Sequence, residues 1–286
     1  MAYRYFIKLA YDGSAYGGWQ IQPNADTVQQ SVETALSIIT GSKISIVGCG
    51  RTDAGVHAAG FYAHFDSDSA FTKPELEQLK FRMNRFLPKE IVIFEVVPVI
   101  PSAHSRFSAV SRKYEYHIIR RKDPFAVNRA YLVHENLDIE KMNVCSSLLV
   151  GRKDFQCFSK SNTQVNNFFC DVQSAQWIEQ NHMLVFTIKA DRFLRNMVRA
   201  IVGTLLDVGR GKLTDEQFQN IIQSRNRSNA GFSVPAKGLT LVEVTFPESI
   251  FTEFPVYFLP ESCEKVIPHH NTDAELHEGS GNETNE

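Results

Sequence analysis

Eight stretches of the chain alternate between apolar and polar residues, a pattern that predicts β-strands because neighbouring side chains of a strand point to opposite faces. Between them, apolar residues recur every three or four positions, which predicts helices with one buried face. The expected strands cover residues 3–11, 43–48, 59–66, 91–99, 112–120, 169–179, 182–190 and 238–246, and the expected helices cover 28–39, 76–86, 138–150, 193–209 and 214–224.

Threonines stand where several of these helices should begin. The hydroxyl oxygen of Thr27, Thr72 or Thr214 can accept a hydrogen bond from a free main-chain N–H group of the first helical turn. Pro74 suits a first turn because no hydrogen bond is needed there from its nitrogen. Gln217 follows Thr214 at the spacing of a capping box. These residues predict helix starts independently of the hydrophobic pattern.

Both halves of the chain mix strands with helices, which predicts an α+β fold built as two similar α/β sandwiches. In each sandwich, we expect an antiparallel sheet backed by helices on one side. The expected N-terminal half covers residues 1–121, followed by a linker at 122–136 and a C-terminal half at 137–258. Residues 259–286 are polar and acidic, and we expect this tail to be disordered.

The net charge of −2 hides an uneven distribution of charge. Residues 261–286 contain seven acids and one lysine, so the rest of the chain carries a net charge of +4. A mildly basic body is compatible with a polyanionic partner, although any one basic cluster can equally be a solvated surface. The clusters are Arg106, Arg112, Lys113, Arg120, Arg121, Lys122 and Arg129, followed by Arg192, Arg195, Arg199, Arg210 and Lys212.

The five cysteines are scattered and show no CxxC spacing. Their arrangement argues against a disulfide framework and a zinc site, and it favours a reducing cytoplasm. No stretch approaches the roughly 20 apolar residues that span a bilayer, and residues 1–11 lack the pattern of a signal peptide. We therefore expect a cytoplasmic protein that has no membrane partner. The sequence also lacks a Walker loop, a GxGxxG loop and a GxSxG elbow.

The segment Gly50–Ala58, with the sequence GRTDAGVHA, concentrates the groups best suited to chemistry. Asp53, Arg51 and His57 stand among small residues between two predicted strands, where catalytic groups are often found. The glycines let the backbone turn sharply or approach a ligand closely. The alternative is a charged turn with a purely structural role, because polar and acidic residues are common in turns.

Other segments supply candidate partners for Asp53. Arg199 lies on a strongly apolar predicted helix, so its guanidinium should be partly buried and should need an anion, which Asp53 could provide. Tyr114 and Tyr116 share one face of a predicted strand, where either ring could stack on a base or fill the core. The aromatic residues at positions 11–23 leave the same two possibilities open.

Six segments, in the order in which they occur, together resemble the bacterial tRNA pseudouridine synthase A family, and the likeness runs from Tyr3 to about Tyr257. GRTDAGVHA is highly specific. The run HSRF at residues 104–107 departs from the Phe-His-Ala-Arg type of run that is usual in the family. The six segments are YDGSAYGGWQIQP, TVQQSVETAL, GCGRTDAGVHA, RFSAVSRKYEY, FLRNMVRAIVGTLLDVG and AGFSVPAKGL.

The resemblance implies an isomerase that converts uridine to pseudouridine at positions 38, 39 and 40 in the anticodon stem-loop of tRNA. Family members need no metal or organic cofactor and work as homodimers. In the family fold, two α+β halves join their sheets into one extended sheet, and a cleft for the RNA lies between the halves.

The resemblance also gives each candidate residue an expected role. Asp53 would be the catalytic nucleophile, which attacks the ribose or the base or else supports an elimination at the ribose. Arg199 would be its ion-pair partner. Tyr114 would stack on the uracil and could help to move the C5 proton. Arg51 would bind a phosphate or take the place of the flipped base.

Two other functions are compatible with parts of the sequence. A non-catalytic tRNA-binding or folding module would use the basic clusters but would not need an intact GRTDAGVHA loop. A carboxylate-dependent hydrolase of the glycosidase type usually needs two acids, and Asp12 is the nearest candidate for a second one beside Asp53.

Overall fold

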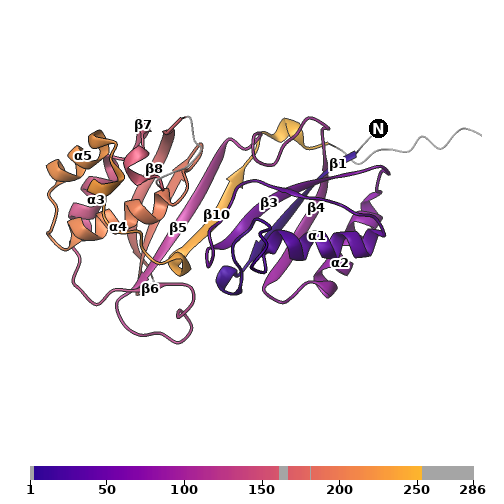
Figure 1. Cartoon of the computed structure of the whole chain (residues 1–286), viewed down its shortest axis with the longest axis horizontal. Coiled ribbons are helices and arrows are strands. Elements are labelled where there is room, and N and C mark those ends of the chain that lie inside the picture. Colours follow the sequence, from indigo (N-terminus) through magenta and orange to yellow (C-terminus); the bar gives the residue numbers. More distant parts are fainter. Residues whose placement is uncertain (1–2, 161–166, 181, 253–286) are drawn as a thin grey trace, which may run out of the picture. The chain divides into compact units, whose positions relative to one another are not determined.

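The structure is a computed structural model that describes residues 3–160, 167–180 and 182–252. Ten of its strands form one sheet. These are β1 (Tyr3–Tyr11), β2 (Val47–Gly48), β3 (His57–Ser67), β4 (Ile91–Val99), β5 (Ser111–Ile119), β6 (Tyr131–Leu132), β7 (Gly151–Asp154), β8 (Phe169–Gln180), β9 (Met183–Ala190) and β10 (Leu239–Thr245). The strands are ordered β4-β1-β3-β10-β5-β9-β8-β7, with β2 paired to β3 and β6 paired to β5 (Figure 1).

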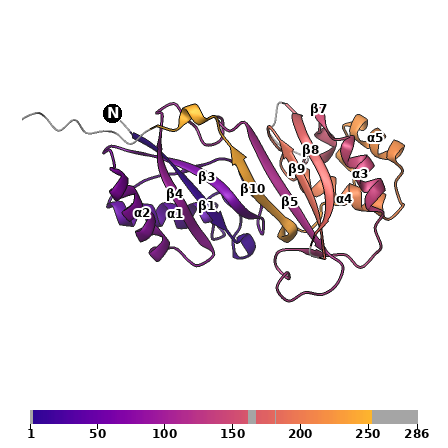
Figure 2. The ribbon, with the colours of Figure 1, turned by 180° about the vertical axis from the view of Figure 1, so that it is seen from behind.

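The α-helices of the described residues lie on one face of this sheet, as the two opposite views show (Figures 1 and 2). α1 (Val28–Thr40) and α2 (Lys73–Phe86) accompany β1, β3 and β4. α3 (Ile139–Ser147), α4 (Met197–Gly209) and α5 (Asp215–Ser224) accompany β7, β8 and β9. The expected α+β class, with helix-backed parts joined through one extended sheet, is therefore confirmed.

The two parts of the sheet are joined by β10, which comes from the C-terminal part of the chain. β10 pairs antiparallel with β5 on one side and parallel with β3 on the other. Leu241 stands opposite Tyr114 of β5 and opposite Ala58 of β3. The resemblance implied a joint between antiparallel sheets, and at this joint β10 pairs antiparallel with β5 but parallel with β3.

The two larger hydrophobic cores of the described residues lie between the helices and the sheet. One core includes Trp19 and receives Leu241 from β10, and the other includes Trp177 and receives Tyr116 from β5. Each core thus takes a strand from the other part of the chain. The division of the chain into halves at residue 121 stays a prediction.

The expected strand at residues 43–48 is reduced to the two residues of β2. Ile44 and Ile46 are buried as the alternation predicted, but their main-chain N–H groups donate to side chains of α1. The acceptors are Ser37 Oγ at 3.0 Å and Glu33 Oε1 at 2.9 Å. These bonds replace the pairing with another strand. The alternating pattern therefore reflects the burial of Ile44 and Ile46 in an irregular segment and not a strand.

The helix expected at 193–209 begins only at Met197. Asn196 has a φ of 68°, in the left-handed region, which interrupts the helical backbone before α4. The helix starts predicted from threonines are confirmed. Thr27, Thr72 and Thr214 each accept a hydrogen bond from the first turn of their helix, and the latter two form complete capping boxes.

Among the described residues, no helix is long and apolar enough to cross a membrane. The four cysteines in the described ranges, Cys49, Cys145, Cys157 and Cys170, are free and buried. Cys263 and the predicted tail at residues 259–286 lie outside the described residues.

Candidate active site

The loop that carries Asp53 connects β2 to β3 and is held in place by the loop that follows β1. Trp19 N donates to Thr52 O at 3.2 Å, and Gly55 N donates to Tyr16 O at 3.4 Å. Main-chain bonds between two loops fix the backbone on both sides of Asp53, so the position of its carboxylate does not depend on side-chain packing alone.

Gly13 allows the two loops to approach each other closely, and Gly55 allows the Asp53 loop to turn. A Cβ atom at Gly13 would collide with the main-chain carbonyl of Val56. Gly55 has a φ of +77°, a left-handed conformation that costs glycine little and other residues more. Substitution at either position would move the loop that holds Asp53.

The aromatic side chains of the loop at residues 11–23 fill the core. Tyr16 and Trp19 are buried, and the ring centroid of Trp19 lies 4.1 Å from that of Phe61 in a stacked arrangement. Of the two possibilities that the sequence left open for these residues, packing is therefore the one observed, and they offer no ring to a base.

His57, at the far end of the GRTDAGVHA segment, connects it to three other parts of the chain. Gly13 N donates to His57 Nδ1 at 3.1 Å. Nε2 of the same ring lies 2.8 Å from Asn128 O and 3.1 Å from Lys237 O. The imidazole is buried, and besides these main-chain groups its Nδ1 lies 3.3 Å from Asp12 Oδ1, so its role in this loop is to hold neighbouring segments together.

Asp53 lies at the meeting point of the Gly50–Ala58 segment and α4. Arg199 Nη1 donates to Asp53 Oδ2 at 3.3 Å, and Arg199 Nε donates to Val234 O at 2.8 Å. The side chains of Arg199 and Asp53 are 20% and 31% exposed. At this exposure an ion pair contributes about 1 kcal/mol or less to stability, so its main effect is to orient the two groups.

A second guanidinium approaches the same carboxylate. Arg195 Nε lies 3.8 Å from Asp53 Oδ1, and its side chain is 61% exposed. Each carboxylate oxygen thus faces one arginine, both from the segment that leads into and begins α4. The sequence predicted the pairing with Arg199 but not this contact of Arg195.

Tyr114 stands at the joint between the two cores and packs against both of them. Its ring makes an edge-to-face contact with Phe193, at a centroid distance of 5.1 Å. Burial raises the pKa of the Tyr114 hydroxyl, with further contributions from the charges of Cys49 and Asp53. Tyr116, on the same face, is fully buried and donates to Pro235 O at 2.8 Å, so it belongs to the core.

Arg51 is exposed, two residues before Asp53. Within the described part of the chain it makes no hydrogen bond or ion pair, whereas Arg199 has both. A guanidinium held on a fixed loop with its donors free is able to bind a phosphate or the edge of a base.

Known proteins that resemble this chain share one description. A family model for tRNA pseudouridine synthase matches residues 146–247. The tRNA pseudouridine synthase A of Parabacteroides distasonis is 51% identical over 248 residues, which cover 87% of this chain and 98% of the relative. The chain belongs to the tRNA pseudouridine synthase A family.

Other members of the family match over a similar length. The tRNA pseudouridine synthase A of Porphyromonas gingivalis is 48% identical over 250 residues, or 87% of this chain and 99% of the relative. That of Acetivibrio thermocellus is 39% identical over 240 residues, or 83% of this chain and 97% of the relative. The likeness therefore spans both cores and the joint between them.

Arg112 is a residue of this pseudouridine synthase whose contacts the sequence did not predict. Its Nη1 donates to Asp191 O at 2.8 Å, and its Nη2 donates to Cys49 O at 3.3 Å and to Arg106 O. Burial lowers the pKa of Arg112. Because every acceptor is a main-chain carbonyl, no pattern of charged residues in the sequence could have predicted these contacts of Arg112.

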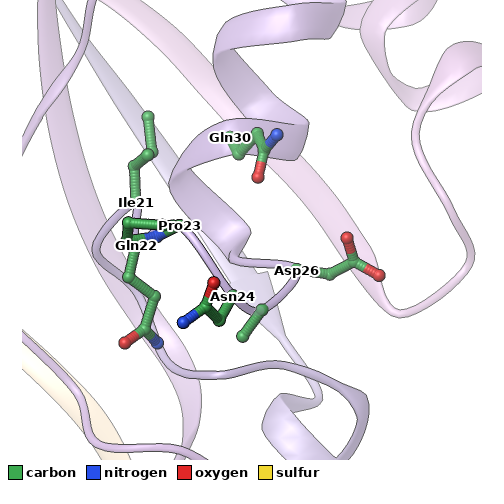
Figure 3. A pocket seen from close by; sticks show the side chains of 7 residues that line it. Ile21, Gln22, Pro23, Asn24, Asp26 and Gln30 are labelled. Carbon is green, nitrogen blue, oxygen red and sulfur yellow. The ribbon is translucent and has the colours of Figure 1, made fainter.

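A separate pocket of about 770 Å³ opens beside the N-terminal end of α1 (Figure 3). None of Asp53, Arg199, Tyr114 and Arg51 lines it, so it does not belong to the candidate active site. Its lining residues are Ile21, Gln22, Pro23, Asn24, Ala25, Asp26 and Gln30.

Proposed function

We propose that this chain converts uridine to pseudouridine at positions 38, 39 and 40 in the anticodon stem-loop of tRNA, with Asp53 as the catalytic nucleophile. The observation that supports Asp53 most strongly is its carboxylate, which is partly exposed on a braced loop and lies 3.3 Å from Arg199 Nη1. The full-length likeness to tRNA pseudouridine synthases supports the reaction.

The reaction rearranges one nucleotide without adding or removing atoms. The N1–C1′ bond of uridine breaks, the uracil turns, and a C5–C1′ bond forms. C5 then loses its proton and N1 gains one. Asp53 can support the positive charge that develops at C1′ by attacking the ribose, can attack the base, or can assist an elimination at the ribose.

The surroundings of Asp53 suit each of these routes. Arg199 donates to one carboxylate oxygen and Arg195 lies 3.8 Å from the other, so both cations orient a carboxylate that is still partly exposed to a nucleotide. We propose that Tyr114 stacks on the uracil. Its hydroxyl is protonated at neutral pH, burial raises its pKa further, and the group can act as a hydrogen-bond donor.

Arg51 would act on the substrate before the chemical step. The target uridine lies in or beside a paired stem, so it must be flipped out to reach Asp53. We propose that the free guanidinium of Arg51 binds a phosphate beside the flipped nucleotide or fills the space that the base has left. The intact GRTDAGVHA loop, with Asp53 between two arginines, argues against a module that only binds tRNA.

Asp12 is poorly suited to serve as the second acid of a hydrolase. Burial alone would raise its pKa, but hydrogen bonds from Ser14 and the charges of His57 and Arg129 outweigh burial and lower it. A general acid needs a raised pKa in order to hold its proton at neutral pH. Asp12 is therefore ionised and engaged with its neighbours, which favours the isomerase.

The variant Asp53→Asn tests the proposal. We expect it to bind tRNA as the wild type does and to form no pseudouridine, because the amide cannot act as a nucleophile. Binding is measured by filter retention of labelled tRNA, and pseudouridine is mapped at single-nucleotide resolution. Full activity of the variant would refute the role of Asp53. Free uracil after incubation of the wild type with tRNA would instead identify a hydrolase.

We also propose that the protein acts in the cytoplasm as a homodimer. The resemblance to the family carries this proposal, and the buried free cysteines suit a reducing compartment. Sedimentation equilibrium of the purified protein tests the dimer, and a monomer at micromolar concentration with tRNA absent and present would contradict it.

A further inference from the structure

The turn at residues 104–108, between β4 and β5, is held by a dense set of local hydrogen bonds. His104 N donates to Ser108 Oγ at 2.9 Å, and Ser108 N donates back to His104 O at 2.8 Å. His104 Nδ1 accepts from Arg106 N at 3.1 Å and from Phe107 N at 3.4 Å. The backbone of this turn is therefore fixed.

Phe107, at the tip of this fixed turn, is 74% exposed. Its ring is accompanied by a cation and by a second ring. Arg106 Cζ lies 5.4 Å from the Phe107 centroid, and the His104 ring centroid lies 4.4 Å from it. Both groups lie close to the phenyl ring, and most of the side chain still faces solvent. Because the turn is already ordered in the free protein, binding of a partner to the ring costs little additional conformational entropy.

The side chain of Arg112 links this turn to the loop that carries Asp53. The guanidinium of Arg112 donates both to Arg106 O and to Cys49 O, which lies four residues before Asp53. The same side chain also donates to Asp191 O, at the start of the segment that leads to Arg195 and α4. Phe107 is therefore positioned by the same residue that positions the two sides of the active site.

We propose that Phe107 is a stacking platform for a nucleobase of the tRNA that neighbours the target uridine, and that Arg106 binds an adjacent phosphate. This inference rests on the proposed function. When the target uridine is flipped out, the neighbouring base loses a stacking partner, and an exposed ring on a fixed turn can replace that partner. The guanidinium of Arg106 beside the ring matches the charge of an RNA backbone.

The aromatic character of Phe107 is tested with the variants Phe107→Ala, Phe107→Leu and Phe107→Trp. We expect Phe107→Ala to weaken binding of an anticodon stem-loop RNA about tenfold, equivalent to about 1.4 kcal/mol. KM should rise by a similar factor while kcat at saturating RNA stays near the wild-type value. Phe107→Trp should restore binding. Phe107→Leu should not, because it keeps the apolar surface without the ring.

Phe81→Ala is the matched control. Phe81 is 60% exposed on α2 and also has a guanidinium near its ring, with Arg85 Cζ 5.9 Å from the centroid. It belongs to a helix and not to the turn attached to the Asp53 loop. We expect this variant to bind RNA as the wild type does.

The dependence of binding on salt separates the two parts of the platform. Stacking releases no counterions, so Phe107→Ala should lower affinity by the same factor at every salt concentration. Arg106→Gln should reduce the slope of log affinity against log salt. If Phe107→Ala binds RNA as the wild type does, or if Phe107→Leu binds as well as the wild type, the stacking role of Phe107 is refuted. Either result leaves the proposed pseudouridine formation untouched. Failure of the wild type to form pseudouridine would overturn the proposed function itself.

Discussion

His64 lies buried on β3 beside the turn that carries Phe107, and its imidazole is uncharged at neutral pH. Ser105 N donates to His64 Nδ1 at 3.2 Å, and Ser105 Oγ lies 2.9 Å from the same nitrogen. Burial, together with the charges of Arg4 and His104, lowers the pKa of His64 to about 4. Protonation of His64 would remove the acceptor that holds Ser105.

The low pKa of His64 predicts a pH-dependent stability. In the unfolded chain His64 takes up its proton near pH 6.5, so between about pH 6.5 and pH 4 the unfolded state binds more protons than the folded state. The contribution of His64 is therefore complete above pH 6.5 and is lost as the pH falls towards 4. The maximum effect is on the order of 3 kcal/mol.

Urea unfolding at several pH values measures this contribution. Between pH 7 and pH 4.5 the wild type should lose more free energy of unfolding than the variant His64→Gln, because the variant has no imidazole to protonate. His134→Gln, at an exposed position, serves as the control and should follow the wild type. Equal pH dependence of the wild type and His64→Gln would contradict the prediction.

Residues of the site differed in how far the sequence could anticipate them. Arg199 could be paired with Asp53 beforehand, because a cation on an apolar helix needs an anion and the small-residue loop offered one. Arg112 and His57 could not be assigned in this way. Arg112 donates to main-chain carbonyls, and His57 contacts main-chain groups and Asp12, and only the folded chain brings these distant segments together.

At the level of elements, α4 and the loop at residues 227–238 act as one unit. Gly203 of α4 packs against this loop so closely that a Cβ atom would collide with Phe232 O. Thr204 Oγ1 accepts from Gly231 N at 2.9 Å, and Val234 O accepts from Arg199 Nε at 2.8 Å. The loop therefore sets the direction of the guanidinium that reaches Asp53.

Gly203→Ala should displace this loop and misorient Arg199. We expect kcat to fall at least tenfold, because small misplacements of catalytic groups are costly, and stability to fall by about 1–3 kcal/mol. Gly209→Ala is the control in the same helix. There a Cβ atom would meet the flexible side chain of Met142, so stability should fall while kcat is preserved. A normal kcat in Gly203→Ala would contradict the role of the loop.

The boundaries of elements were predictable where a local signal determines them. Thr72 and Thr214 marked helix starts through bonds made within four residues. The late start of α4 depends on the left-handed Asn196, whose side chain donates to Ser233 Oγ at 2.6 Å, a contact far away in sequence. The hydrophobic spacing alone predicted a helix from residue 193, because Phe193 lies at the right spacing before Met197 to extend the apolar stripe.

At the scale of the whole molecule, β10 couples the two cores. It pairs with β3 and β5, and Leu241 enters the core that contains Trp19 while its neighbour Leu239 enters the core that contains Trp177. A strand shared in this way should make the cores unfold together.

The two tryptophans test this coupling, because each reports on one core. The variants Trp19→Phe and Trp177→Phe each keep one indole. Within each variant, the urea midpoint measured by the fluorescence of that indole should equal the midpoint measured by circular dichroism. Leu241→Ala should lower both transitions together, by about 2–5 kcal/mol. Separate midpoints for fluorescence and circular dichroism within one variant would contradict a single cooperative unit.

The place of β10 also orders the events of protein synthesis. The chain leaves the ribosome from its N-terminus, so β3 and β5 are made long before the strand that fills the space between them. Until residues 239–245 have emerged, both strands present a free edge, and the loop that orients Arg199 has no fixed end. A nascent chain of this enzyme therefore cannot complete its active site until residues 239–245 have emerged.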